Sequence, residues 1–153
     1  MTIEVIENLE IKRKVALKIL KNLYEWFGKE ESLLNYVDNL EGKKFYLLNL
    51  EKENIGFFSI KRNNKYTAEL YVNGILEEYH NRGYGKMVMK KIVEDLKEEG
   101  YKFLMVKTVG ESLVNEAYSK TRKFYSSVGF LPLEEIKEIW GEDNPCLIMV
   151  KNI

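Results

Sequence analysis

Apolar side chains, with one threonine among them, recur every three or four positions in four segments of the chain. This spacing predicts four amphipathic helices. Gly28, Gly42, Gly100 and Gly129 follow these segments and are expected to end the helices. The periodic positions, in chain order, are Ile11, Val15, Ile19, Leu23 and Trp26; Leu33, Val37 and Leu40; Met89, Ile92, Val93 and Leu96; and Tyr118, Thr121, Tyr125 and Val128.

Seven further segments are rich in aromatic and β-branched residues, which favours strands. Short polar turns at 51–54 and 62–65 join the second, third and fourth of them, so we expect an antiparallel meander. A helix precedes the fifth strand, and such a crossover suits parallel pairing. Gly74 interrupts the fourth strand and indicates a bulge or a close approach of another backbone. The predicted strands are Thr2–Ile6, Phe45–Leu50, Ile55–Ile60, Tyr66–Leu76, Phe103–Val109, Phe130–Ile139 and Leu147–Lys151.

These elements follow one another without a linker, a repeat or a low-complexity stretch. The 153 residues suit one domain. We therefore predict a single domain over residues 1–153. Its fold class is α/β (or α+β), with a mixed, mostly antiparallel central sheet and helices on both faces.

Charge and composition exclude several kinds of protein. Basic and acidic residues both number 24, and the zero formal net charge argues against a general nucleic-acid binder. The apolar runs are too short to cross a bilayer, and the first residues do not resemble a signal peptide. Cys146 and His80 are the only residues of their types, so we expect no disulfide and no metal site. These features predict a cytoplasmic protein, and the many Lys, Asn and Ile residues hint at a bacterial one.

A glycine-rich turn joins the fourth strand to the third helix and is the most informative part of the sequence. A strand that leads through Arg82-Gly83-Tyr84-Gly85 into a helix presents several backbone N–H groups to one point, which attracts a phosphate. A nucleotide-triphosphate loop needs Ser or Thr after Lys86, where Met87 stands. A dinucleotide-binding loop needs a third glycine, where Val88 stands.

Three motifs, which follow one another along the chain in the order of the family, resemble those of the GNAT N-acetyltransferases. His80–Gly85 resembles the R/Q-x-x-G-x-G/A loop that binds the coenzyme A pyrophosphate in that family. Phe124–Phe130 resembles the F/L-Y-x-x-x-G-F signature, and Ala68–Val72 resembles the strand of the histone acetyltransferase branch. The order of elements matches over nearly the whole chain, which implies a GNAT-like fold.

The chain also departs from the family pattern. His80 stands where Arg or Gln is usual, and Glu77 stands at a position that is often proline. Tyr118 and Thr121 replace a common Asn and Ala of the last helix. These replacements put in doubt a side-chain contact to the pantetheine arm.

The resemblance implies direct transfer of an acetyl group from acetyl-CoA to a primary amine in a ternary complex. The loop would bind the pyrophosphate through backbone N–H groups, and a bulge in the preceding strand would bind the pantetheine and polarise the thioester carbonyl. The residues expected to bind the cofactor are Asn73, Gly74, Ile75, His80, Asn81, Arg82, Gly83, Tyr84, Gly85 and Lys86.

Two side chains match catalytic positions of the family. Glu69 is the candidate general base, although it lies roughly 13–20 Å before the bulge along an extended strand and would work through water. The alternative is a carboxylate that is solvated or orients the substrate. Tyr125 is the candidate general acid for the departing thiolate, and the alternative is a buried tyrosine with a satisfied hydroxyl. Cys146 as a nucleophile is less favoured than Cys146 as a core residue.

The acceptor is expected to be the amine of a small molecule, of polyamine, aminoglycoside-like or amino-acid-like type. In this fold the N-terminal helices and the last hairpin enclose the acceptor. The acidic turn Trp140–Pro145 would favour a cation there. Alternatives are a non-catalytic acyl-CoA-binding or regulatory module and a protein lysine or N-terminal acetyltransferase. A homodimer is common in the family. The candidate acceptor contacts are Tyr24, Trp26, Phe27, Tyr36, Trp140, Asp143 and Asn144.

Overall fold

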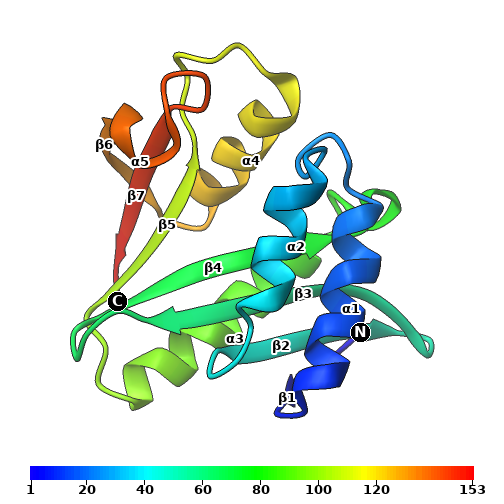
Figure 1. The fold of residues 1–153 in the computed structure, drawn as a ribbon. Coiled ribbons are helices and arrows are strands. Elements are labelled where there is room, and N and C mark those ends of the chain that lie inside the picture. Colours follow the sequence, from blue (N-terminus) through cyan, green and yellow to red (C-terminus); the bar gives the residue numbers. More distant parts are fainter.

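The computed structural model describes residues 1–153, which form seven strands, five α-helices and one 3₁₀ turn (Figure 1). The strands are β1 (Thr2–Ile6), β2 (Lys44–Leu50), β3 (Glu53–Arg62), β4 (Thr67–Ile75), β5 (Phe103–Val109), β6 (Leu131–Ile136) and β7 (Cys146–Asn152). The helical elements are α1 (Leu9–Lys21), α2 (Glu30–Asp38), η1 (Glu77–Tyr79), α3 (Tyr84–Glu98), α4 (Glu116–Ser127) and α5 (Lys137–Trp140).

The strands form one sheet in the order β1-β2-β3-β4-β5-β7-β6, and only β4 and β5 are parallel neighbours. This confirms the predicted class, the meander and the parallel crossover. The parallel pairing joins Thr67–Leu70 to Phe103–Val106 and then stops, although both strands continue. Figure 1 shows β4 and β5 diverging beyond it. The sheet therefore opens between its two halves.

A bulge lies in β4 just where the two strands part. Phe58 of β3 pairs with Asn73, whereas Ile60 pairs with Leu70, so Ser59 faces two residues of β4. The buried Ser59 hydroxyl donates to the carbonyl of Val72 at 2.7 Å, and the Val72 N–H donates back to it at 3.2 Å. The predicted position of the bulge at Gly74 is therefore wrong by about two residues, because Ser59 supplies the hydrogen bonds that stabilise it earlier.

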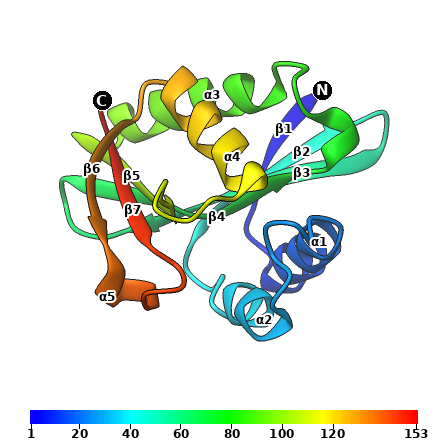
Figure 2. The same cartoon turned by 90° about the horizontal axis from the view of Figure 1, so that it is seen from above.

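Helices cover both faces of the sheet and divide the core in two (Figure 2). One face packs against α3 and α4 around residues such as Tyr46, Phe58 and Ile92. The other packs against α1 and α2 around Phe45 and Phe57, whose rings stack 5.0 Å apart. None of the helices has the length and apolar character needed to cross a membrane.

Two predicted elements end or divide earlier than expected. The first helix ends at Lys21, not at Gly28, because the Asn22 side chain donates to the carbonyl of Lys18 and the chain then turns. The segment predicted as one strand over Phe130–Ile139 is the strand β6 followed by the one-turn helix α5.

Candidate active site

A cavity of about 1100 Å³ occupies the opening between β4 and β5. Its walls come from the α1–α2 connection (residues 22–29), α2, Phe58 of β3, the end of β4, β5, the start of α3 and one face of α4. Trp140 and Asn144, near the last hairpin, complete it. The cavity therefore collects side chains from both halves of the chain.

The glycine-rich turn forms one end of this cavity, and we call residues Asn81–Lys86 the phosphate loop. None of its six backbone N–H groups donates a hydrogen bond within the protein. The hydrogen bonds of α3 begin only with the N–H of Met87, which donates to the Gly83 carbonyl at 3.1 Å. Asn81 and Gly83 have positive φ values of 59° and 84°, and these left-handed conformations produce the sharp turn of the backbone before α3. The loop therefore fits a phosphate group, which accepts such donors at a positive helix end.

Close packing of two helices fixes the loop beside α4. A Cβ added to Gly85 would lie 2.6 Å from the ring of Phe124, so only glycine fits there without a shift. Five of the six loop residues line the cavity, and Arg82 does not. Its guanidinium lies over the ring of Tyr79, 5.6 Å from the centroid.

His80 ties the loop back to the strand that precedes it. One ring nitrogen, Nε2, makes a hydrogen bond of 2.6 Å with the Ile75 carbonyl. The ring also packs edge-on against Trp26, with centroids 5.8 Å apart. Asn73, Gly74 and Ile75 likewise line the cavity, directly after the bulge. Gly74 lies against the side chains of Leu23 and Ile19: an added Cβ would lie 2.7 Å from Leu23 and 3.2 Å from Ile19.

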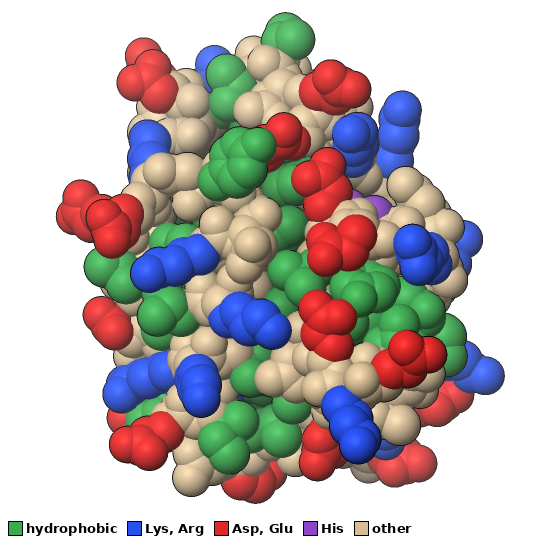
Figure 3. All heavy atoms as spheres, turned by 90° about the vertical axis from the view of Figure 1, so that its right-hand side faces the viewer, with side chains coloured by type: hydrophobic (Ala, Val, Ile, Leu, Met, Phe, Trp, Pro, Cys, Tyr) green, Lys and Arg blue, Asp and Glu red, His purple; other side chains and the backbone are tan.

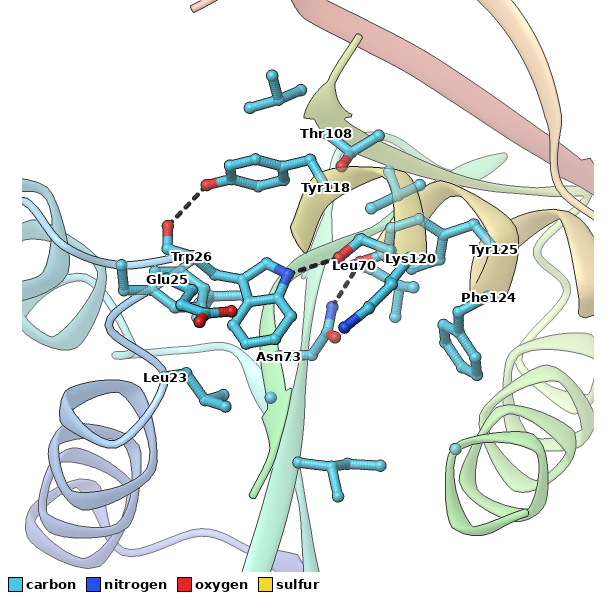
Figure 4. Close-up of a pocket in the computed structure, with 18 of the residues that line it drawn as sticks. Leu23, Glu25, Trp26, Leu70, Asn73, Thr108, Tyr118, Lys120, Phe124 and Tyr125 are labelled. Carbon is cyan, nitrogen blue, oxygen red and sulfur yellow. Dashed lines mark hydrogen bonds between the residues drawn. The ribbon is translucent and has the colours of Figure 1, made fainter. Parts of the chain in front are cut away.

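Tyr125 projects from α4 into the centre of the site, where Figure 4 shows its hydroxyl facing Asn73. The Asn73 side-chain amide donates to this hydroxyl at 3.1 Å. The tyrosine is 5% exposed. Burial raises the pKa of Tyr125 to about 12, although the hydrogen bond from Asn73 acts in the opposite direction. The hydroxyl thus keeps its proton at neutral pH and can donate it.

Glu69 lies outside the cavity lining. It is 5% exposed, and its carboxylate accepts a hydrogen bond of 2.9 Å from the Asn63 amide. The ammonium of Lys107, which does line the cavity, is 3.7 Å from its other oxygen. The structure therefore brings Tyr125, Asn73 and the phosphate loop together around the cavity and leaves Glu69 behind Lys107.

Hydrogen bonds between Trp26 and α4 form a bridge across the cavity, a role of Trp26 that the sequence did not reveal. The Trp26 indole N–H donates to the Thr121 hydroxyl at 2.9 Å and to the Ala117 carbonyl at 3.1 Å (Figure 4). In return, the Tyr118 hydroxyl donates to the Trp26 carbonyl at 2.6 Å. Tyr118 and Thr121 are the two departures noted in the last helix. Their partner lies over 90 positions earlier, so no local pattern could have indicated it.

The remaining candidates divide between the cavity and the core. Tyr24, Phe27 and Tyr36 line the cavity together with Trp140 and Asn144, whereas Glu142 and Asp143 do not line it. Cys146 is fully buried. Burial raises the pKa of its thiol to about 11, which disfavours the reactive thiolate at neutral pH.

A mixed sheet that opens beside a loop of free N–H groups agrees with the GNAT-like fold that the sequence predicts. The chain belongs to the acetyltransferase (GNAT) family, whose family model matches residues 13–130. The predicted family and fold class are thus confirmed. No curated protein matches the sequence.

Solved structures of this family share the fold over almost the whole chain. A GNAT-family protein from Desulfovibrio desulfuricans has a TM-score of 0.79 at 16% identity, with 99% of each chain covered. A GNAT acetyltransferase from Elizabethkingia anophelis with acetyl-CoA bound has a TM-score of 0.70 at 16% identity, covering 99% of this chain and 97% of that one. The ribosomal-protein-S18-alanine N-acetyltransferase of Escherichia coli has a TM-score of 0.76 at 16% identity, covering 99% and 93%.

Proposed function

We propose that this protein transfers an acetyl group from acetyl-CoA to the primary amine of a small molecule. The observation that carries the proposal is the phosphate loop, whose N–H groups are unpaired and five of whose six residues line the same cavity as Tyr125. A structure similar in fold, the Elizabethkingia protein, contains acetyl-CoA.

The residues present fit the cofactor at two places. The phosphate loop would bind the pyrophosphate through its N–H groups and the positive end of α3. Beyond Leu70 the edge of β4 is not paired with β5, so the backbone of Asn73–Ile75 would bind the pantetheine as a neighbouring strand would. His80 would support this contact by fixing the carbonyl of Ile75.

In the reaction, the amine nitrogen attacks the thioester carbonyl carbon and forms the amide bond. The carbon–sulfur bond breaks and its electron pair leaves on sulfur, which Tyr125 protonates. The attacking nitrogen gives up one proton. Holding both reactants in the cavity makes the attack effectively unimolecular, and no covalent enzyme intermediate is needed.

Glu69 is proposed as the base that receives the amine's proton through water. Replacing Glu69 with Gln keeps an acceptor for Asn63 but removes the base. We expect lower turnover and an ascending pH–rate limb displaced to higher pH, with the KM for acetyl-CoA unchanged. Glu77→Gln, an exposed carboxylate of η1, is the control. A pH profile identical to that of the unaltered protein would exclude Glu69 from proton transfer.

Free-thiol release with a broad panel of amines tests the function itself. We expect acetyl-CoA to raise the melting temperature, and at least one amine to release CoA above the background of hydrolysis. Propionyl-CoA and longer acyl-CoA molecules, used in the same assay, establish whether acetyl is the group carried. Binding of acetyl-CoA without release by any amine would instead favour a non-catalytic acyl-CoA-binding module.

A further inference from the structure

The bridge between Trp26 and α4 crosses the cavity. The phosphate loop, His80 and Phe124 line the cavity, and the His80 ring packs edge-on against Trp26. Three further aromatic residues line it together: Phe27 packs edge-on against Tyr36 with centroids 6.1 Å apart, and Tyr36 packs against Tyr71 at 5.5 Å. We call Phe27, Tyr36 and Tyr71 the aromatic wall. It suits an apolar group of the acceptor.

The charged residues that line the cavity are mostly basic. Five are lysines, and Glu25 is the only carboxylate. Two of the lysines belong to the cofactor side: Lys86 is part of the phosphate loop, and Lys123 precedes Phe124, which packs on Gly85. The other three are Lys29, Lys107 and Lys120.

Lys120 is the lysine best placed to meet the acceptor. Lys107 is held by Glu69 at 3.7 Å, whereas Lys120 forms no ion pair. In the view of Figure 4 its ammonium extends from α4 toward the Asn73 side chain. In the same view Glu25 extends from the opposite wall. An acceptor between them meets one positive and one negative group.

A polyamine would place several positive charges beside the lysines that line the cavity, with Glu25 as the only carboxylate to balance them. A carboxylate on the acceptor would instead form a charge-assisted pair with Lys120, an exposed side chain that lines the cavity and has no ion-pair partner within the protein. Resting on the proposed function, we propose that the acceptor is an amino-acid-like amine, whose carboxylate binds Lys120 and whose apolar side chain packs on the aromatic wall.

Matched pairs that differ only by the carboxylate test this proposal: alanine and ethylamine, leucine and isoamylamine, phenylalanine and 2-phenylethylamine. We expect the amino acid of at least one pair to have a kcat/KM up to roughly fivefold above its amine, as a charge pair at an exposed side chain provides. Spermidine should react more slowly than that amino acid. Free-thiol release measures all of these rates.

Lys120→Met removes the ammonium and keeps an apolar stem of similar length. It should reduce the preferred amino acid to the rate of its matched amine, without changing the amine's rate or the KM for acetyl-CoA. Lys90→Met, an exposed lysine of α3 outside the cavity, is the control and should change nothing. A higher KM for acetyl-CoA in Lys120→Met would assign Lys120 to the cofactor and overturn the proposal.

A binding measurement separates this inference from the proposed function. Calorimetric titration of the same pairs into the protein saturated with CoA compares their affinities without turnover. Tighter binding of the amino acid that is lost in Lys120→Met supports the carboxylate contact, even if no amine is acetylated. The lack of acetylation of any amine would refute only the proposed transferase activity. If no amino acid binds or reacts better than its decarboxylated partner, the inference is wrong.

Discussion

At the scale of single residues, Tyr125 is the side chain on which the proposed chemistry depends most directly. Its hydroxyl is buried, accepts a hydrogen bond from Asn73 and has a pKa raised by burial to about 12. A hydroxyl with this pKa is protonated at neutral pH, so it cannot serve as the base there. It does carry the proton that a departing thiolate needs.

Replacing Tyr125 with Phe should lower kcat by roughly a hundredfold, the scale of general acid catalysis. The KM for acetyl-CoA should stay the same, because the ring still packs against Phe124 and Phe130. Steady-state thiol release measures both constants. Tyr66→Phe, which removes an exposed hydroxyl outside the cavity, controls for the substitution itself. Turnover unchanged in Tyr125→Phe would contradict the general-acid role.

At the scale of elements, the sequence predicted what local patterns determine and missed what distant contacts determine. Leu23 and Trp26 continue the helical spacing of α1, yet the chain leaves the helix at Lys21 and Trp26 bonds to α4. Gly74 indicated a bulge or the approach of another backbone, but the bulge lies earlier and the atoms close to Gly74 belong to the side chains of Leu23 and Ile19. The bulge depends on Ser59, a partner on another strand.

Trp26→Phe should loosen the α1–α2 connection. Phenylalanine keeps an aromatic ring but cannot donate the two hydrogen bonds to α4. We expect faster amide hydrogen exchange in residues 22–29 and a larger rise in the KM for the acceptor than in the KM for acetyl-CoA. Trp140→Phe, on the other wall and without a hydrogen bond from its indole, is the control. Exchange as slow as in the unaltered protein would show that the bridge does not hold the connection.

Ser59→Ala should destabilise the protein by about 1–3 kcal/mol, because it leaves the buried N–H and carbonyl of Val72 without this partner. Urea unfolding measures the change in free energy. Ser126→Ala, which removes an exposed hydroxyl from α4, should have little effect. A Ser59→Ala variant as stable as the Ser126→Ala variant would mean that the hydroxyl does not stabilise the bulge.

At the scale of the whole molecule, one topological feature makes the site. One hydrophobic cluster packs α3 and α4 against one face of the sheet, and another packs α1 and α2 against the other face. Between these two halves the sheet opens where β4 and β5 separate. The face of the molecule shown in Figure 3 mixes acidic and basic side chains. The antiparallel meander and the parallel crossover could be predicted from the sequence, whereas the position of β7 between β5 and β6 was not. The contents of the cavity could not, because they depend on which side chains the opened sheet brings together.

The tyrosines around the cavity should make the fold sensitive to alkali. Burial raises the pKa of Tyr118 and Tyr125 to about 12 and also raises that of Tyr36. An unfolded tyrosine titrates near pH 10. Between these values the native protein holds protons that the unfolded chain has released. The stabilisation is therefore complete below about pH 10 and is lost as the pH rises toward 12.

The buried Tyr125 alone should contribute a loss of about 1 kcal/mol per pH unit near pH 11. Urea unfolding at neutral pH and near pH 11 measures the free energy of unfolding on each side of the transition. In Tyr125→Phe this free energy should fall less steeply with pH, because one of the shifted protons is gone. Tyr66→Phe removes an exposed hydroxyl and should fall as the unaltered protein does. Equal slopes in Tyr125→Phe and Tyr66→Phe would mean that burial does not hold the Tyr125 proton, and its part as a ready acid would lose its physical basis.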